Sequence, residues 1–125
     1  MAQLEPVLEP VTVVALLTPR PGRVDDVLAA FADVSPLVHR EPGCELYSAH
    51  TDGSVVIMVE RWTSRLELDA HARGAALARL NELNSGLLEG PYDVWFLAAV
   101  PLGDPTRGVI PRRVDEVGGA LSTRG

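Results

Sequence analysis

Three residues with chemically useful side chains lie in the twelve-residue stretch ERWTSRLELDAH, residues 60–71: Glu60, Trp62 and His71. His71 is the candidate catalytic residue. A neutral imidazole has a pKa of about 6.5, so it can accept a phenolic proton or bind the resulting oxyanion. That step makes a hydroquinone electron-rich enough to react with dioxygen. A second interpretation is that His71 hydrogen-bonds to backbone or solvent and only packs, and the sequence alone leaves both open.

Candidate substrate contacts lie on the strand that precedes His71. Alternate residues of a strand share a face, which places Met58, Glu60 and Trp62 together. Trp62 could line a cavity and stack on a planar substrate, while Glu60 could orient His71 or pair with an arginine. The structural alternative is stronger for both residues: Trp62 as packing against a helix or a partner, and Glu60 as an ion-pair or cap partner.

His50 is a further candidate for substrate binding, although a histidine beside a turn is more often simply exposed. Two sets of side chains alternate along its strand: Leu46, Ser48 and His50 against Glu45, Tyr47 and Ala49. Each set contains one large apolar and one polar member, so polarity does not decide which set faces inward.

Charge and composition exclude several classes of partner. The eleven basic residues, all arginine, face seventeen acidic ones, for a net charge of −6. No basic stripe is available to neutralise a phosphate backbone, and we expect no nucleic-acid partner. No apolar run approaches the roughly 18 to 20 residues that span a bilayer, so we expect a soluble protein with no membrane partner. The N-terminus lacks the basic and apolar regions of a signal peptide, which indicates a cytoplasmic location.

We expect neither a metal nor an organic cofactor. Three scattered histidines and the single Cys44 do not form a ligand spacing such as H-x3-H or C-x2-C. The turns that contain glycine do not match a dinucleotide-binding fingerprint. Any oxygenation would therefore proceed without a flavin or nicotinamide bound by this chain, and Cys44 is expected to be a buried, inert thiol.

Hydrophobic periodicity predicts one α+β domain at residues 11–100, between an extended leader, 1–10, and a Pro/Gly-rich tail, 101–125. The expected elements follow in chain order: a strand at 11–17, a helix from 23 that Pro36 kinks or breaks, a hairpin that turns at Asp52-Gly53, a helix capped by Ser64, a further helix after Gly74, and a strand at 92–100. This βαββαβ order is the ferredoxin-like arrangement, in which a four-stranded antiparallel sheet carries both helical segments on one face.

Three of the predicted strands are apolar at both odd and even positions. In one of them, Val55, Ile57 and Val59 oppose Val56 and Met58. Helices on one face cannot cover both sets, and a bare face of this kind exceeds the roughly few hundred Å² that monomers tolerate. We therefore expect a homodimer, sheet against sheet, with a cavity between the helices and the sheet of each chain.

Four segments in unbroken order carry a resemblance to a known family: PGR before the first helix, EPGCELYSAH, ERWTSRLELDAH and GPYDVWFL. Together they resemble the antibiotic biosynthesis monooxygenase domain family from Val11 to Val100. The resemblance implies a dimeric α/β barrel built from ferredoxin-like halves. It also implies cofactor-free oxygenation of quinols or polyketide aromatics in some members and haem degradation in others.

The residues that distinguish the haem-degrading members of this family are absent. Their strand asparagine falls at Ala15, their pocket tryptophan at His71 and their proximal histidine at Asn81. Without an axial ligand nothing is expected to hold haem iron.

The leading hypothesis is a cofactor-independent monooxygenase that acts on an electron-rich aromatic or quinol with dioxygen, using His71 as base or oxyanion partner. The alternative is a non-catalytic module of the same fold that binds a small molecule or another protein. The tail after residue 100 favours this alternative slightly, because a minimal enzyme of this kind has no place for it.

Overall fold

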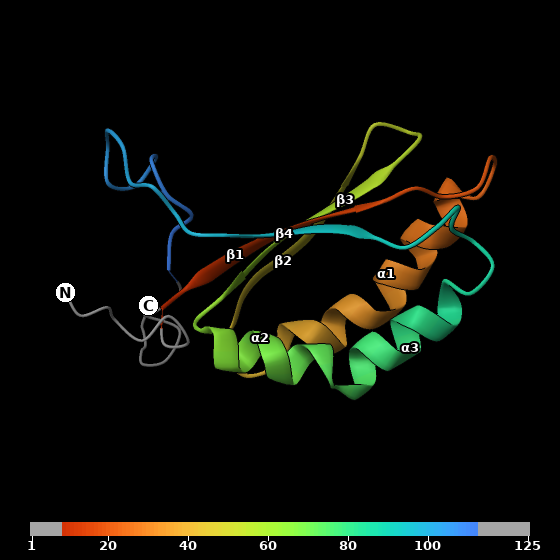
Figure 1. Cartoon of the computed structure of the whole chain (residues 1–125), viewed down its shortest axis with the longest axis horizontal. Coiled ribbons are helices and arrows are strands. Elements are labelled where there is room, and N and C mark those ends of the chain that lie inside the picture. The colour runs from red at the N-terminus through yellow and green to blue at the C-terminus, as the bar shows by residue number, and fades with distance from the viewer. Residues whose placement is uncertain (1–8, 113–125) are drawn as a thin grey trace.

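The computed structural model describes residues 9–112, which form a four-stranded sheet with helices on one face (Figure 1). The elements follow in chain order: β1 (Val11–Leu17), α1 (Val24–His39), β2 (Cys44–Thr51), β3 (Val56–Trp62), α2 (Arg65–Ala72), α3 (Ala75–Leu83) and β4 (Asp93–Leu97). The strands lie in the order β2-β3-β1-β4, and every neighbouring pair is antiparallel. The predicted ferredoxin-like α+β fold is confirmed.

Alternation along the central strands determines which residues face the helices. In β1, Val13, Ala15 and Leu17 are buried, and in β3 Val56 and Met58 are buried. Apolar side chains of α1 cover them, among them Val27, Phe31 and Val34. Burial of such side chains supplies most of the folding free energy, so this layer between sheet and helices is the core.

Of the expected kink or break at Pro36, the break does not occur. Helix α1 runs through Pro36 and ends at His39. Proline removes one backbone hydrogen bond of the helix. Val34 and Val38, on either side of Pro36, are fully buried against the core. Tertiary packing at these positions keeps the last turn helical despite the missing donor.

The hairpin between β2 and β3 turns where the Asp-Gly pair predicts it. Gly53 has a φ of +97°, which is a conformation that glycine adopts without steric cost. Asp52 accepts hydrogen bonds through Oδ1 from the backbone amides of Ser54 and Val55. These bonds hold the pKa of Asp52 below its ordinary value, because they favour the charged carboxylate.

Ser64 is the N-cap of α2, as the sequence predicts, but its hydrogen bond differs from that of a capping box. The hydroxyl donates to the side chain of Glu67 and makes no bond to a backbone amide of the first turn. Gly74 separates α2 from α3, also as predicted. Strand β4 is shorter than expected, since it ends at Leu97, and it forms one edge of the sheet.

No helix in residues 9–112 is both long enough and apolar enough to cross a bilayer.

Candidate functional site

A cavity of about 150 Å³ lies between the sheet and the helices. Its walls come from every strand and helix of the domain and are almost entirely apolar: Val13, Ala15, Leu17, Phe31, Tyr47, Met58, Glu60, Leu68, His71, Ala72, Leu77, Leu80, Tyr92, Val94 and Phe96. Only four of these side chains carry groups that can exchange a proton. A small apolar space with a few polar groups is typical of a site for a small organic ligand.

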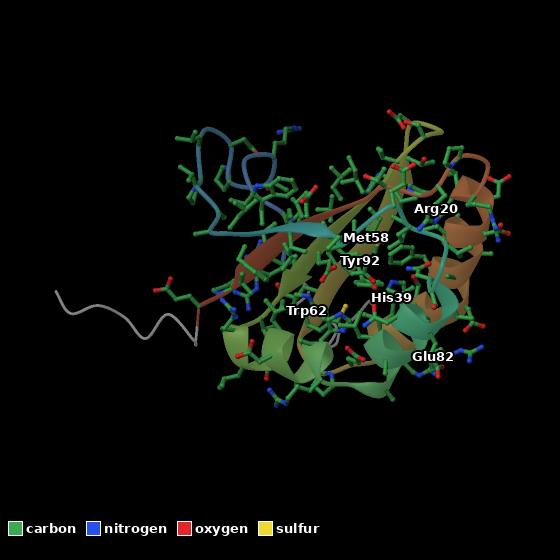
Figure 2. All side chains as sticks on the ribbon, turned by 45° about the vertical axis from the view of Figure 1, so that its right-hand side comes forward. Arg20, His39, Met58, Trp62, Glu82 and Tyr92 are labelled. Carbon is green, nitrogen blue, oxygen red and sulfur yellow. The ribbon has the colours of Figure 1, made fainter. Side chains whose placement is uncertain are left out.

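Cross-strand pairing fixes the floor of the cavity. One row runs across the sheet through Tyr47, Glu60, Val13 and Phe96, because these residues are paired partners on neighbouring strands. The row beside it contributes Met58, Ala15 and Val94 to the floor and continues to Ala49, which lies outside the cavity. Figure 2 shows Met58 and Tyr92 in the space between the sheet and the helices. The floor therefore places one carboxyl group, on Glu60, among apolar side chains.

His71 lies in the helical wall of the cavity, which we call its roof, and three side chains contact it. Its Nδ1 lies 2.7 Å from Glu41 Oε1, and its side chain is 5% exposed. The imidazole lies over the Trp62 ring at 4.6 Å between centroids and 30° between planes. The Tyr47 ring meets it edge-on at 5.7 Å. These contacts leave the imidazole little freedom to rotate.

Glu60 is a buried carboxyl group in the cavity wall. Its Oε1 accepts a hydrogen bond of 3.0 Å from Trp62 Nε1. Burial raises the pKa of Glu60 above its ordinary value, while the Trp62 bond and a positive charge on His71 oppose this rise. A positive charge on His71 therefore favours the charged carboxylate form of Glu60.

Two phenols complete the polar lining. Burial raises the pKa of Tyr47 strongly, and the nearby Glu60 carboxylate raises it further. Burial also raises the pKa of Tyr92, whose hydroxyl donates to Asn81 Oδ1 at 2.8 Å. Both phenols therefore stay protonated near neutral pH and act as hydrogen-bond donors or acceptors, not as bases.

The five residues selected from the sequence fall into three places. Met58, Glu60 and His71 line the cavity. Trp62 is fully buried behind His71 and is not part of the cavity wall, so it supports the imidazole and has no free face for a ligand. His50 is exposed at the far end of β2, where its Nε2 bonds to Ser48 Oγ at 2.8 Å, and it also lies outside the cavity.

Glu41 is the site residue that sequence reasoning missed. It lies in the turn between α1 and β2, thirty positions before its partner His71. Sequence reasoning gave the role of orienting His71 to Glu60, which bonds to Trp62 instead. The signal available was the EPG motif: Gly43 has a φ of +81°, and an added Cβ there would overlap the Glu67 side chain. This tight turn brings the segment that carries Glu41 against α2.

Among residues 9–112, no three histidine, cysteine or carboxylate side chains are grouped so that they could hold a metal ion.

Comparison with known proteins identifies the family. The family model for antibiotic biosynthesis monooxygenase matches residues 10–83, which is more than half of the chain. The chain belongs to the antibiotic biosynthesis monooxygenase family. No curated protein matches it.

Solved structures similar to this member of the antibiotic biosynthesis monooxygenase family share its fold over most of its length. Rv0793 from Mycobacterium tuberculosis is 29% identical with a TM-score of 0.68, covering 78% of this chain and 100% of its own. A structure named antibiotic biosynthesis monooxygenase is 26% identical with a TM-score of 0.67, covering 73% of this chain and 99% of its own. PA3566 from Pseudomonas aeruginosa, at 23% identity and a TM-score of 0.68, covers 75% of this chain and 97% of its own and shows the fold alone.

The three positions to which the sequence resemblance assigns the residues of haem-degrading members lie in or beside the cavity wall. Ala15 is part of its floor and His71 part of its roof. Asn81 accepts the hydrogen bond of the Tyr92 hydroxyl. Of these three residues only His71 carries an imidazole, and its Nδ1 is hydrogen-bonded to Glu41.

Proposed function

We propose that the protein is a cofactor-independent monooxygenase that oxidises an electron-rich aromatic, a quinol, with His71 as the base. The observation that carries this proposal is the buried His71 at the cavity wall with a carboxylate on its Nδ1. The family supports the reaction type, since one similar structure is itself named as a monooxygenase.

The pairing with Glu41 determines which nitrogen can act. When Nδ1–H donates to the Glu41 carboxylate, the neutral imidazole keeps its lone pair on Nε2. That nitrogen is then the acceptor for a phenolic proton of a bound substrate. The imidazolium that forms is stabilised by Glu41 and by the Glu60 carboxylate across the cavity. Holding the base in one tautomer and one orientation removes much of the entropic cost of the proton transfer.

The electron balance shows that a quinol can act as both substrate and reductant. Reduction of dioxygen to one inserted oxygen atom and one water molecule needs four electrons. A dihydroxy ring supplies two when it becomes a quinone and two more when one ring C–H becomes C–OH, so hydroquinone and dioxygen give hydroxybenzoquinone and water. No external reductant is required. Removal of the first phenolic proton is the step that the protein assists, because the phenolate gives an electron to dioxygen far more readily than the phenol.

Turnover of reduced quinols by metal-free protein tests this function. With hydroquinone under oxygen, we expect His71→Ala to lower the rate by about 10² to 10⁴, the usual contribution of a general base. His50→Ala is the matched control, since it removes an exposed histidine outside the cavity, and we expect no change in rate. Oxygen uptake and product absorbance give the rate.

Two results would contradict the proposal in different ways. Equal rates for wild type and His71→Ala would remove His71 from the mechanism. Background rates for both, together with binding of the quinol, would instead support the binding module of the same fold.

We further propose that two chains pair through the sheet face opposite the helices. On this face Val14 lies between Val59 and Trp95, and Leu16 lies beside Ile57, as paired partners on neighbouring strands. Trp95 is 49% exposed within one chain. Covering such an apolar row with the same row of a second copy would bury both at once, as a symmetric dimer allows. The pairing would form the barrel that the family resemblance implies.

A further inference from the structure

The volume of the cavity limits what it can enclose. A space of about 150 Å³ is the size of an engineered apolar cavity in another protein that binds benzene. One aromatic ring therefore fits between the sheet and the helices, and a second fused ring does not fit without movement of the walls. Because protein interiors are close-packed, such movement has an energetic cost.

Three of the four polar lining residues lie opposite the open side of the cavity. Tyr47 and Glu60 are paired on β2 and β3, and His71 contacts Tyr47, so these groups gather on the side away from β4. The fourth, Tyr92, lies next to β4, and its hydroxyl already donates to Asn81. That side is closed, since Tyr47 is 6% exposed. On the β4 side, Val94 is 39% and Phe96 is 53% exposed, although both line the cavity. A ring that enters past β4 therefore brings its leading hydroxyl group to His71.

Ala15 makes the space for the ring. It lies in the middle of the floor, paired with Met58 on one side and Val94 on the other. Ala15 is 6% exposed, and the larger residues before and after it on this face, Val13 and Leu17, also line the cavity. A larger side chain at this one position would project directly into the volume that a ring occupies.

We infer that the cavity selects a single phenolic ring, which enters hydroxyl-first past Phe96 on β4, and that Ala15 is the residue that determines this size limit. The inference rests on the proposed function for the identity of the reacting group. It adds the substrate class, which is a one-ring phenol or hydroquinone. Any substituent opposite the leading hydroxyl points out between Val94 and Phe96, where the Arg65 guanidinium lies over the Phe96 ring at 4.7 Å from its centroid.

Binding of phenol and of 1-naphthol, measured by calorimetry, tests the size limit without turnover, because neither probe carries a second hydroxyl group. We expect wild type to bind 1-naphthol at least about tenfold more weakly than phenol, since a misfit of even one methylene has an effect of this order. Ala15→Leu should weaken phenol binding at least about tenfold, with a melting temperature equal to or above that of wild type because it fills a void. Ala49→Leu is the matched control, since Ala49 lies in the same cross-strand row but outside the cavity. It should bind phenol like wild type.

A second variant enlarges the space. Leu77 belongs to the roof and is only partly buried, so Leu77→Ala should fold and should improve 1-naphthol binding relative to phenol. The inference is overturned if wild type binds both probes equally or neither, if Ala15→Leu leaves phenol binding unchanged, or if Ala15→Leu lowers the melting temperature well below that of Ala49→Leu. Selective phenol binding without any quinol oxidation would support the size limit and contradict only the proposed function.

Discussion

The three histidines of the chain differ in the group to which each imidazole is hydrogen-bonded. His39 Nε2 lies 3.0 Å from the carbonyl oxygen of Tyr47, so it must be protonated and donate there. His50 pairs with the hydroxyl of Ser48. Among residues 9–112, His71 is the histidine that contacts a carboxylate, that of Glu41. The carboxylate fixes the orientation of the His71 ring and, when Nδ1–H donates to it, leaves Nε2 as the acceptor.

The buried Glu60 makes stability depend on pH in a defined direction. Its pKa is raised in the folded protein above the ordinary 4.5. The folded state therefore binds this proton more tightly than the unfolded state. Its stabilising contribution is complete below about pH 4.5 and is lost as pH rises through the folded pKa. Glu41 raises this pKa and a charged His71 lowers it, and burial is the largest influence.

We predict that Glu60→Gln raises the melting temperature relative to wild type increasingly as pH rises from 4.5 to 8. Glutamine cannot ionise, and its amide oxygen can still accept the hydrogen bond of Trp62 Nε1. Thermal unfolding followed by circular dichroism across this range gives the difference. Glu82→Gln removes the same charge from the exposed surface of α3, away from the cavity (Figure 2), and controls for net charge. A difference that is constant with pH, or that falls as pH rises, would contradict the prediction.

At the scale of elements, local patterns identified the strands and helices where the chain itself carries the signal. The span of β1, the turn at Asp52-Gly53 and the division at Gly74 follow directly from alternation, turn chemistry and helix propensity. The continuity of α1 through Pro36 did not follow, because it depends on packing of Val34 and Val38 that no local rule contains.

The side-chain orientation in β2 is a second feature that alternation in the sequence does not predict. A bulge between Cys44 and Leu46 shifts the register against β3, so that Leu46 is the strand partner of Arg61. The bulged residue Glu45 forms an ion pair with the Arg61 side chain, while Tyr47 faces the helices. Strict alternation assigns Glu45 and Tyr47 to the same face. The contact between Glu41 and His71 is equally non-local, since it joins a turn and a helix that the fold brings together. The shared face of Met58 and Glu60 follows from the sequence, whereas the inward side of β2 and the partner of the base do not.

The turn that carries Glu41 requires a residue without a side chain at position 43. Gly43 and Gly53 both have a positive φ, of +81° and +97°. An added Cβ at Gly43 would overlap Glu67 and contact Thr63, whereas at Gly53 it would meet open space. We predict that Gly43→Ala lowers the free energy of unfolding by at least about 1 kcal/mol more than Gly53→Ala, because both share the backbone strain and only one adds a clash. Urea unfolding of the two variants measures this difference. Equal losses would show that the turn does not pack against α2 as described.

At the scale of the whole molecule, the two faces of the sheet are covered differently. The helices cover most of one face, and on that face Val94 and Phe96 of β4 stay partly exposed. Residues 98–112, blue in Figure 1, lie on the other side of the sheet at one end. There Arg61 Nη1 donates to the carbonyl oxygen of Ile110 at 3.2 Å, and Arg112 Nε lies 2.6 Å from Glu45 Oε2. This segment therefore covers the row of Arg61 and leaves uncovered the apolar row of Val14, Val59 and Trp95, through which we propose that two chains pair.

We predict that wild type sediments as a dimer at micromolar concentration and that Val59→Glu sediments as a monomer. In a symmetric dimer the substitution places two carboxylates in the apolar contact, and burying an unpaired charge costs several kcal/mol, so the dimer should dissociate at least about a hundredfold more readily. Ala49→Glu adds the same charge to an exposed strand position on the opposite face, outside the cavity, and should remain dimeric. Circular dichroism establishes that both variants are folded. A monomeric wild type, or a Val59→Glu dimer of unchanged affinity, would show that this face is not the interface.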